Sequence, residues 1–196
     1  MTDKERFINI VKDLCQSRVD VEKFIQYLKQ NTDFFEAPAS TKFHLCERGG
    51  LLKHSLDVYD NLVALTQIYY EDVNYESVAI VGLFHDLCKA NFYKLENKWV
   101  KANEKWTTKQ VYVVNDEFPI GHGEKSVIML LRQNFKLTDE EICAIRWHMN
   151  GFDCAVKGGE IAFQNAMNSK HSKLATLLQA ADIIAANIVE GDCWDE

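Results

Sequence analysis

The chain has 196 residues, 47% of them hydrophobic, and a formal net charge of -7 at pH 7. This length can bury one sizeable core and is too short for two ordinary domains, so we expect a single domain over residues 1–196. The acidic balance argues against the broad positive field with which proteins follow a long nucleic-acid backbone. A local positive pocket for one phosphate group stays open, because net charge says little about a single cleft.

The N-terminal segment from Met1 to Arg6 is charged and polar, and we find no apolar run near the roughly 18 to 20 residues that a membrane span needs. The cysteines form no Cys-x-x-Cys pair and no zinc-knuckle spacing. They lie at positions 15, 46, 88, 143, 154 and 193. We therefore interpret them as reduced thiols and expect a cytoplasmic protein that contacts no membrane.

Helices should dominate the fold, because the chain has two prolines and its apolar residues recur at intervals of three and four. Thr2-x-x-Glu5 is a capping box that opens the first helix, and a second helix is expected over residues 19–30. We expect these N-terminal helices, within residues 1–32, to pack on a core formed by residues 33–190. Between them and the next helix, Pro38 and the pair Gly49-Gly50 indicate an irregular connection.

The next predicted helix begins near Leu51 and carries His54, and another covers residues 75–89 and carries His85 and Asp86. Later helices are expected over residues 123–134, 138–149 and 171–190. The Thr138-x-x-Glu141 sequence is a second capping box.

The segment between residues 91 and 121 is rich in residues that favour strands, among them Trp99, Trp106 and the run 110–114. This composition predicts a small β-hairpin around residues 95–116. Residues 96–98 and 103–105 are the expected turns. Two readings of Trp99, Trp106 and Tyr112 stay open, and packing within the hairpin is favoured over stacking on a nucleic-acid base.

Six histidines and aspartates draw attention because most of them sit within apolar or glycine-flanked runs. Burying a polar group without a partner costs on the order of 1 to 3 kcal/mol, and a bare carboxylate costs much more. The groups must therefore find partners, and a shared metal ion would satisfy imidazoles and carboxylates that converge on one point. The candidate ligands are His54, His85, Asp86, His122, His148 and Asp182.

Adjacent residues on a helix project about 100 degrees apart, so His85 and Asp86 can meet one cation only from a helix end. With two oxygens, Asp86 can bind one metal ion or bridge two. Lys89 follows one turn after Asp86 and is placed to offer a positive charge to a phosphate oxygen.

This ordered set of motifs resembles the HD superfamily of metal-dependent phosphohydrolases, whose pattern is His, then His-Asp, then Asp on successive helices. His54, His85-Asp86 and Asp182 match that pattern. The resemblance implies an all-α HD bundle, and in members that bind two metals further histidines fall where His122 and His148 lie here. It extends to compact stand-alone HD hydrolases of bacteria and phages, and to the HD domain of exoribonucleases that carry a separate OB domain. One departure is Cys88, where related binuclear enzymes have glycine before the lysine.

The resemblance implies one or two divalent transition-metal ions, with Fe or Mn preferred and Ni, Co, Zn or Mg open. Asp86 would bridge the metals, and Lys89 would offset charge on the phosphate. Two alternatives stay open for His122 and His148, which either bind metal or support the ligands from outside. His44, in the loop before His54, is a further candidate for contacting substrate.

The expected function is hydrolysis of phosphate esters of a nucleotide or a small nucleotide-like substrate by metal-activated water. One alternative is a 3′–5′ exonuclease or phosphodiesterase acting on single-stranded nucleic acid, which the acidic composition disfavours. The other is a catalytically inactive nucleotide-binding regulatory module, which need not keep every ligand. The oligomeric state and any partner protein leave no signal in the sequence.

Overall fold

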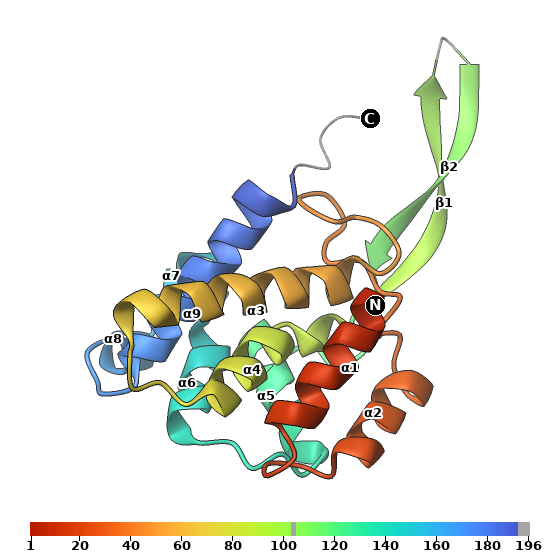
Figure 1. Cartoon of the computed structure of the whole chain (residues 1–196). Helices are drawn as coiled ribbons and strands as arrows, with labels where there is room; N and C mark the ends of the chain where they lie inside the picture. Colours follow the sequence, from red (N-terminus) through yellow and green to blue (C-terminus); the bar gives the residue numbers. More distant parts are fainter. Residues whose placement is uncertain (103–104, 192–196) are drawn as a thin grey trace.

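The computed structural model describes residues 1–102 and 105–191, and it is mainly helical with one two-stranded antiparallel sheet (Figure 1). The prediction of a helical HD-type fold with a small hairpin is confirmed. The α-helices are α1 (Asp3–Leu14), α2 (Val21–Gln30), α3 (Gly50–Tyr69), α4 (Tyr75–Phe84), α5 (His122–Arg132), α6 (Asp139–Trp147), α7 (Cys154–Lys157), α8 (Ile161–Met167) and α9 (Ser172–Ile184). Short 3₁₀ helices cover Leu87–Lys89 and Asn150–Phe152, a π-helical turn covers Ala185–Val189, and the strands are β1 (Tyr93–Ala102) and β2 (Lys105–Val114).

Side-chain caps explain where several helices begin. Both predicted capping boxes are present, at Thr2 with Glu5 and at Thr138 with Glu141. The second helix begins at Val21 because the Asp20 side chain accepts a hydrogen bond from the backbone of Lys23, so the prediction that it starts at residue 19 is two residues early. The prediction also omitted α7 and α8, whose first turns are capped by the side chains of residues 153 and 160.

The N-terminal helices share the hydrophobic core of the later helices. The ring of Phe84, on α4, lies 5.8 Å from that of Phe7 on α1 and 5.3 Å from that of Phe24 on α2. Phe24 also meets Phe135, beyond the end of α5, at 4.8 Å. Residues of both N-terminal helices therefore belong to the same hydrophobic core as those of the later helices, while the assignment of one domain, with residues 1–32 packed on a core of residues 33–190, stays a prediction.

The hairpin projects away from the helices as a twisted ribbon (Figure 1). Its existence is confirmed, but the predicted turn at residues 96–98 is wrong, because these residues lie within β1 and pair with residues 109–111 of β2. The other predicted turn includes residues 103–104, which lie outside the described residues. Trp99 and Trp106 share one face by strand alternation and are 69% and 67% exposed, so packing within the hairpin does not cover them.

The stretch Ser172–Val189 is apolar and long enough to cross a membrane by length and composition alone, which the sequence reading had missed. Core helices pass the same test, and Leu174, Leu178 and Ala181 of α9 are fully buried against the rest of the bundle.

The interpretation of all cysteines as thiols is wrong for Cys46, which is disulfide-bonded, whereas Cys15, Cys88, Cys143 and Cys154 are free. Cys193 lies outside the described residues.

A buried ion pair joins the turn after α1 to α6. Arg18 donates to Glu141 at 2.6 Å and to the carbonyl oxygen of Lys136 at 2.8 Å. Ser77, on α4, donates to the other oxygen of Glu141 at 2.7 Å. The Glu141 carboxylate is completely buried, so it depends on these donors.

We expect Arg18→Met to lower the free energy of unfolding by about 3 to 5 kcal/mol, because it leaves the Glu141 carboxylate buried without its counter-charge. Urea denaturation measures this loss. Arg6→Met is the matched control, since Arg6 forms an exposed ion pair with Asp60 that should contribute about 0 to 1 kcal/mol. Equal losses in the two variants would contradict the prediction.

Candidate metal centre

Five of the six predicted ligands meet inside the bundle, each supplied by the end or the interior of a helix. His54 lies in the second turn of α3, and His85 caps the C-terminus of α4 with Asp86 directly after it. His148 caps the C-terminus of α6, and Asp182 lies near the end of α9. The helix predicted over residues 75–89 ends earlier, because α4 stops at Phe84 and a 3₁₀ turn follows, and this gives His85 and Asp86 the helix end that their convergence on one cation requires.

Asp86 lies at the centre of this group. Its Oδ2 atom is 3.5 Å from Nε2 of both His54 and His85, and its Oδ1 atom is 3.4 Å from Nε2 of His148. Asp182 Oδ1 is 3.2 Å from His54 Nε2 and 4.0 Å from His85 Nε2. Ligand atoms of His54, His85 and Asp86, and likewise of His85, His148 and Asp182, lie within 4.8 Å of one another.

The other ring nitrogens fix how these imidazoles face the centre. Nδ1 of His85 is 3.0 Å from the carbonyl oxygen of Gly82, and Nδ1 of His148 is 2.7 Å from that of Ile145. A carbonyl oxygen can only accept, so each Nδ1 must donate, and in the neutral ring Nε2 then carries a lone pair. These two lone pairs therefore point toward the carboxylates.

The chemistry of this donor set fits a cation. His148 Nε2 and Asp86 Oδ1 are buried and lack a hydrogen-bond partner among the described residues. Nε2 of His54 and Nε2 of His85 also face each other at 3.3 Å. Buried polar atoms without a partner, such as Asp86 Oδ1 and His148 Nε2, leave their desolvation uncompensated, and imidazole nitrogens with carboxylate oxygens are ligands for divalent transition metals.

The pKa values of these side chains also indicate that the site favours a positive charge. Burial opposes ionisation of Asp86, but the Lys89 charge and the neighbouring imidazoles hold its pKa well below the usual range. Burial lowers the pKa of His85 to about 4. At His54, burial is outweighed by hydrogen bonds to Asp182, Asp86 and Glu190, which raise its pKa. Protons and metal ions compete for such nitrogens, so this position attracts either.

Lys89 forms a close ion pair with Asp86, with Nζ 2.6 Å from Oδ2. Burial opposes its charge, but Asp86 raises its pKa, so the ammonium stays protonated. The departure at Cys88 does not disturb this turn, because Cys88 has no positive φ and its backbone amide donates to Ser126 at 3.0 Å. Burial raises the pKa of the Cys88 thiol to about 12.

His122 is the predicted ligand that the structure does not bring into these groups of ligand atoms. Its Nδ1 lies 3.3 Å from the Cys88 sulfur, and its ring packs 5.5 Å from that of Phe92. Packing explains the glycine at the neighbouring position 123, because a Cβ on Gly123 would come within 2.2 Å of the Arg146 carbonyl oxygen. A direct role of His122 as a ligand stays a prediction.

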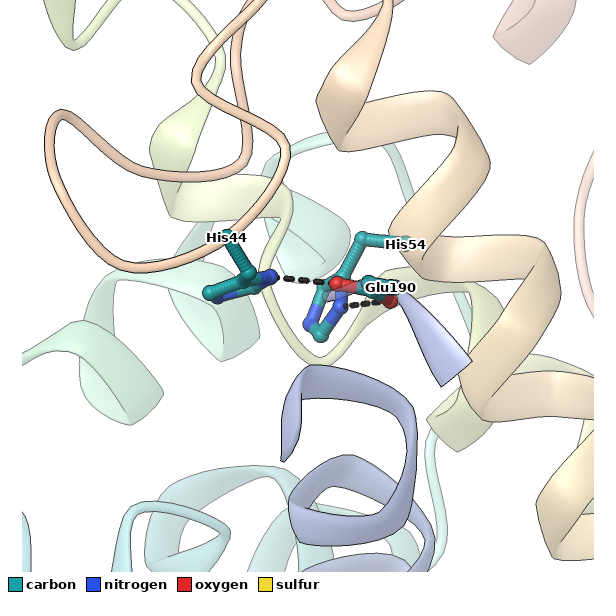
Figure 2. Close-up of side chains that lie close together, drawn as sticks. All are labelled: His44, His54 and Glu190. Atoms are coloured by element: carbon teal, nitrogen blue, oxygen red, sulfur yellow. Dashed lines mark hydrogen bonds and ion pairs between the residues drawn. The ribbon is translucent and has the colours of Figure 1, made fainter. Parts of the chain in front are cut away.

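Sequence reasoning missed Glu190. Its carboxylate lies between His44 and His54 (Figure 2), accepting from His54 Nδ1 at 2.8 Å and contacting His44 Nδ1 through its other oxygen. Burial is outweighed by these two contacts, which lower the pKa of Glu190 to about 2. His44 is thus held by a carboxylate, and its predicted contact with substrate stays a prediction.

A helical bundle that gathers buried histidines and aspartates in this way is an architecture of metal-dependent hydrolases. The family model described as the HD domain matches residues 51–187, and the chain belongs to this family. Searches of curated proteins and of solved structures found no match. The family match spans His54, His85, Asp86, His148 and Asp182 but ends before Glu190.

We expect His148→Ala to lose bound metal and His122→Ala to retain it, because His148 faces Asp86 whereas His122 faces a thiol. The measurement is elemental analysis of protein purified without chelators or a metal-affinity tag and then equilibrated with Mn²⁺. Equal metal loss in the two variants would place His122 among the ligands and contradict the prediction.

Proposed function

We propose that this protein is a metal-dependent phosphohydrolase that cleaves phosphate esters of a nucleotide or a small nucleotide-like substrate. The observation that supports this most directly is the convergence of imidazole Nε2 atoms on the buried carboxylate of Asp86 and the partly buried carboxylate of Asp182. Membership of the HD family supports the hydrolase class, and the phosphate ester and the nucleotide are the proposal.

The residues that would hold the metal are His54, His85, Asp86, His148 and Asp182. Mixed imidazole and carboxylate ligation without thiolate suits Fe or Mn, with Ni, Co, Zn and Mg open. When bound, such an ion polarises phosphoryl oxygens and lowers the pKa of a coordinated water. A second ion would need further ligands, for which His122 is the nearest predicted source.

Lys89 would give this site its positive charge for substrate. Its side chain is 13% exposed, and its ammonium is already held beside the carboxylate of Asp86 that would bind metal. We propose that it contacts a phosphate oxygen of the bound substrate and offsets the negative charge that grows there during hydrolysis. Asp86 then has two tasks, since it would bind metal with its oxygens and orient Lys89.

The net charge of -7 favours a small nucleotide over an extended nucleic acid. One observation favours the second candidate, a nuclease acting on single strands. The hairpin exposes Trp99 and Trp106, and in its register Lys101 lies opposite Trp106 on the same face. Exposed aromatic rings beside lysines are the elements with which proteins stack and hold single-stranded nucleic acid.

The test is an assay of Mn²⁺- or Fe²⁺-loaded protein on a panel of nucleotides and on single-stranded oligonucleotides. We expect phosphate release from nucleotides. Folded His85→Ala and Asp182→Ala variants should lose at least about 100-fold in activity, which is more than is typical for residues that contact a metal ligand rather than the metal. Oligonucleotide cleavage that falls in Trp99→Ala/Trp106→Ala, with inert mononucleotides, would establish the nuclease instead. Inactivity of the metal-loaded wild type on both substrate classes would favour the regulatory module.

We expect Lys89→Met to lower kcat/KM by roughly 100-fold, because it removes a cation that would stabilise the transition state. Lys89→Arg should recover part of this loss, and metal content should not change in either variant. Lys94→Met is the control, because Lys94 is an exposed hairpin lysine paired with Glu96. Wild-type kinetics in Lys89→Met would remove this residue from the proposed machinery.

A further inference from the structure

The Glu190 carboxylate is fully buried, although it follows the last helical turn of the described chain. Its two oxygens contact two imidazoles from different parts of the chain, one on α3 and one in the loop before α3 (Figure 2). The family match stops at residue 187, so it does not cover this carboxylate. A buried carboxylate whose two oxygens each contact a histidine is held in one position, so Glu190 is a fixed part of the site.

The π-helical turn Ala185–Val189 brings Glu190 to this place. In a regular α-helix, a residue eight positions after Asp182 would point about 80 degrees away from it, and the seventh would align best. A π turn accommodates one extra residue, shown here by the bond from the Glu190 amide to the Ala185 carbonyl oxygen at 3.0 Å. Glu190 therefore takes the aligned position, and Asp182 and Glu190 contact opposite nitrogens of the same ring, His54.

His54 needs this partner more than the other two histidines do. His85 and His148 cap their helices, where the last carbonyl oxygens have no helical partner and can accept from Nδ1. His54 lies inside α3, where the carbonyl oxygens of the preceding turn already accept backbone hydrogen bonds. The partner of its Nδ1 is instead the Glu190 carboxylate, which comes from outside the helix.

The second oxygen of Glu190 fixes the loop before α3. Ser40 organises this loop by accepting from the amide of His44 at 3.0 Å and donating to its carbonyl oxygen at 2.8 Å. The loop thereby presents the His44 ring to Glu190, and the rings of His44 and His54 contact each other with their centroids 4.7 Å apart. His44 and His54 thus contact different oxygens of the same carboxylate.

We propose that Glu190 is a positioning residue of the metal centre, which keeps the proton of His54 on Nδ1 and directs Nε2 toward Asp86 and Asp182. The proposal rests on the proposed metal-dependent function for its consequence, but the orientation of His54 is a property of the metal-free chain. A carboxylate that accepts from a ligating imidazole also makes that imidazole a stronger metal ligand.

The decisive variant is Glu190→Met, which preserves volume but offers no strong acceptor. Long-range ¹H–¹⁵N correlation spectra of the metal-free full chain report separately whether Nδ1 and Nε2 of His54 carry a proton. We expect the wild type to hold the proton on Nδ1, the variant to lose that preference, and Mn²⁺ affinity by titration calorimetry to fall about 10- to 100-fold. Glu36→Gln, which breaks the exposed ion pair with Arg48 near the same loop, should match the wild type in both measurements.

Two further variants separate positioning from other roles. Glu190→Gln keeps a neutral acceptor, so it should keep the proton on Nδ1 and lose less Mn²⁺ affinity than Glu190→Met, and it decides the question where Glu190→Met does not fold. His44→Ala leaves the bond between Glu190 and His54 in place, so His54 should keep its Nδ1 proton.

Three results would overturn the proposal. They are a wild-type His54 spectrum in Glu190→Met, a proton lost from Nδ1 in Glu190→Gln as fully as in Glu190→Met, and a loss of Mn²⁺ affinity in His44→Ala equal to that in Glu190→Met. The last result would indicate that His44 and Glu190 bind metal directly. A wild type that binds Mn²⁺ but hydrolyses no phosphate ester would instead reject the proposed function and leave both readouts for Glu190 intact.

Discussion

The buried carboxylate of Asp86 is the constraint on which the rest of the structure depends. It lies within 3.5 Å of three imidazole nitrogens and 2.6 Å from the Lys89 ammonium, and it has almost no exposed surface. An ionised carboxylate in such a place carries a desolvation penalty of several kcal/mol, which only well-placed partners offset. These partners come from α3, α4 and α6, so the packing of the helices is also the assembly of the site.

Much of this arrangement could be predicted because its signals are local. A His-Asp pair at the end of an apolar run requires a helix end, and α4 indeed stops at Phe84. Both capping boxes depend on residues three positions apart, and both are formed. By contrast, the exposure of Trp99 and Trp106 depends on where the hairpin projects, which strand alternation alone does not determine.

One site residue, Glu190, escaped prediction for a reason of helix geometry. Glu190 could not be found from regular helical spacing, because the π turn shifts it into line with Asp182. His122 looked like a ligand between two glycines, but Gly123 is explained by the close approach of α5 to the Arg146 backbone, and the histidine ring faces Cys88. Of the six predicted ligands, five thus lie together, His122 stays a predicted ligand, and the Glu190 carboxylate lies behind His54.

The balance of charge connects these observations. The site contains three carboxylates, those of Asp86, Asp182 and Glu190. Lys89, which forms an ion pair with Asp86, brings one positive charge to the same region. Hydrogen bonds to all three carboxylates raise the pKa of His54 against the effect of burial, so a proton on His54 supplies part of the missing positive charge. A divalent cation at the same nitrogens would replace that proton and supply the rest. The excess of negative charge is therefore the physical reason that this buried cluster suits a metal ion.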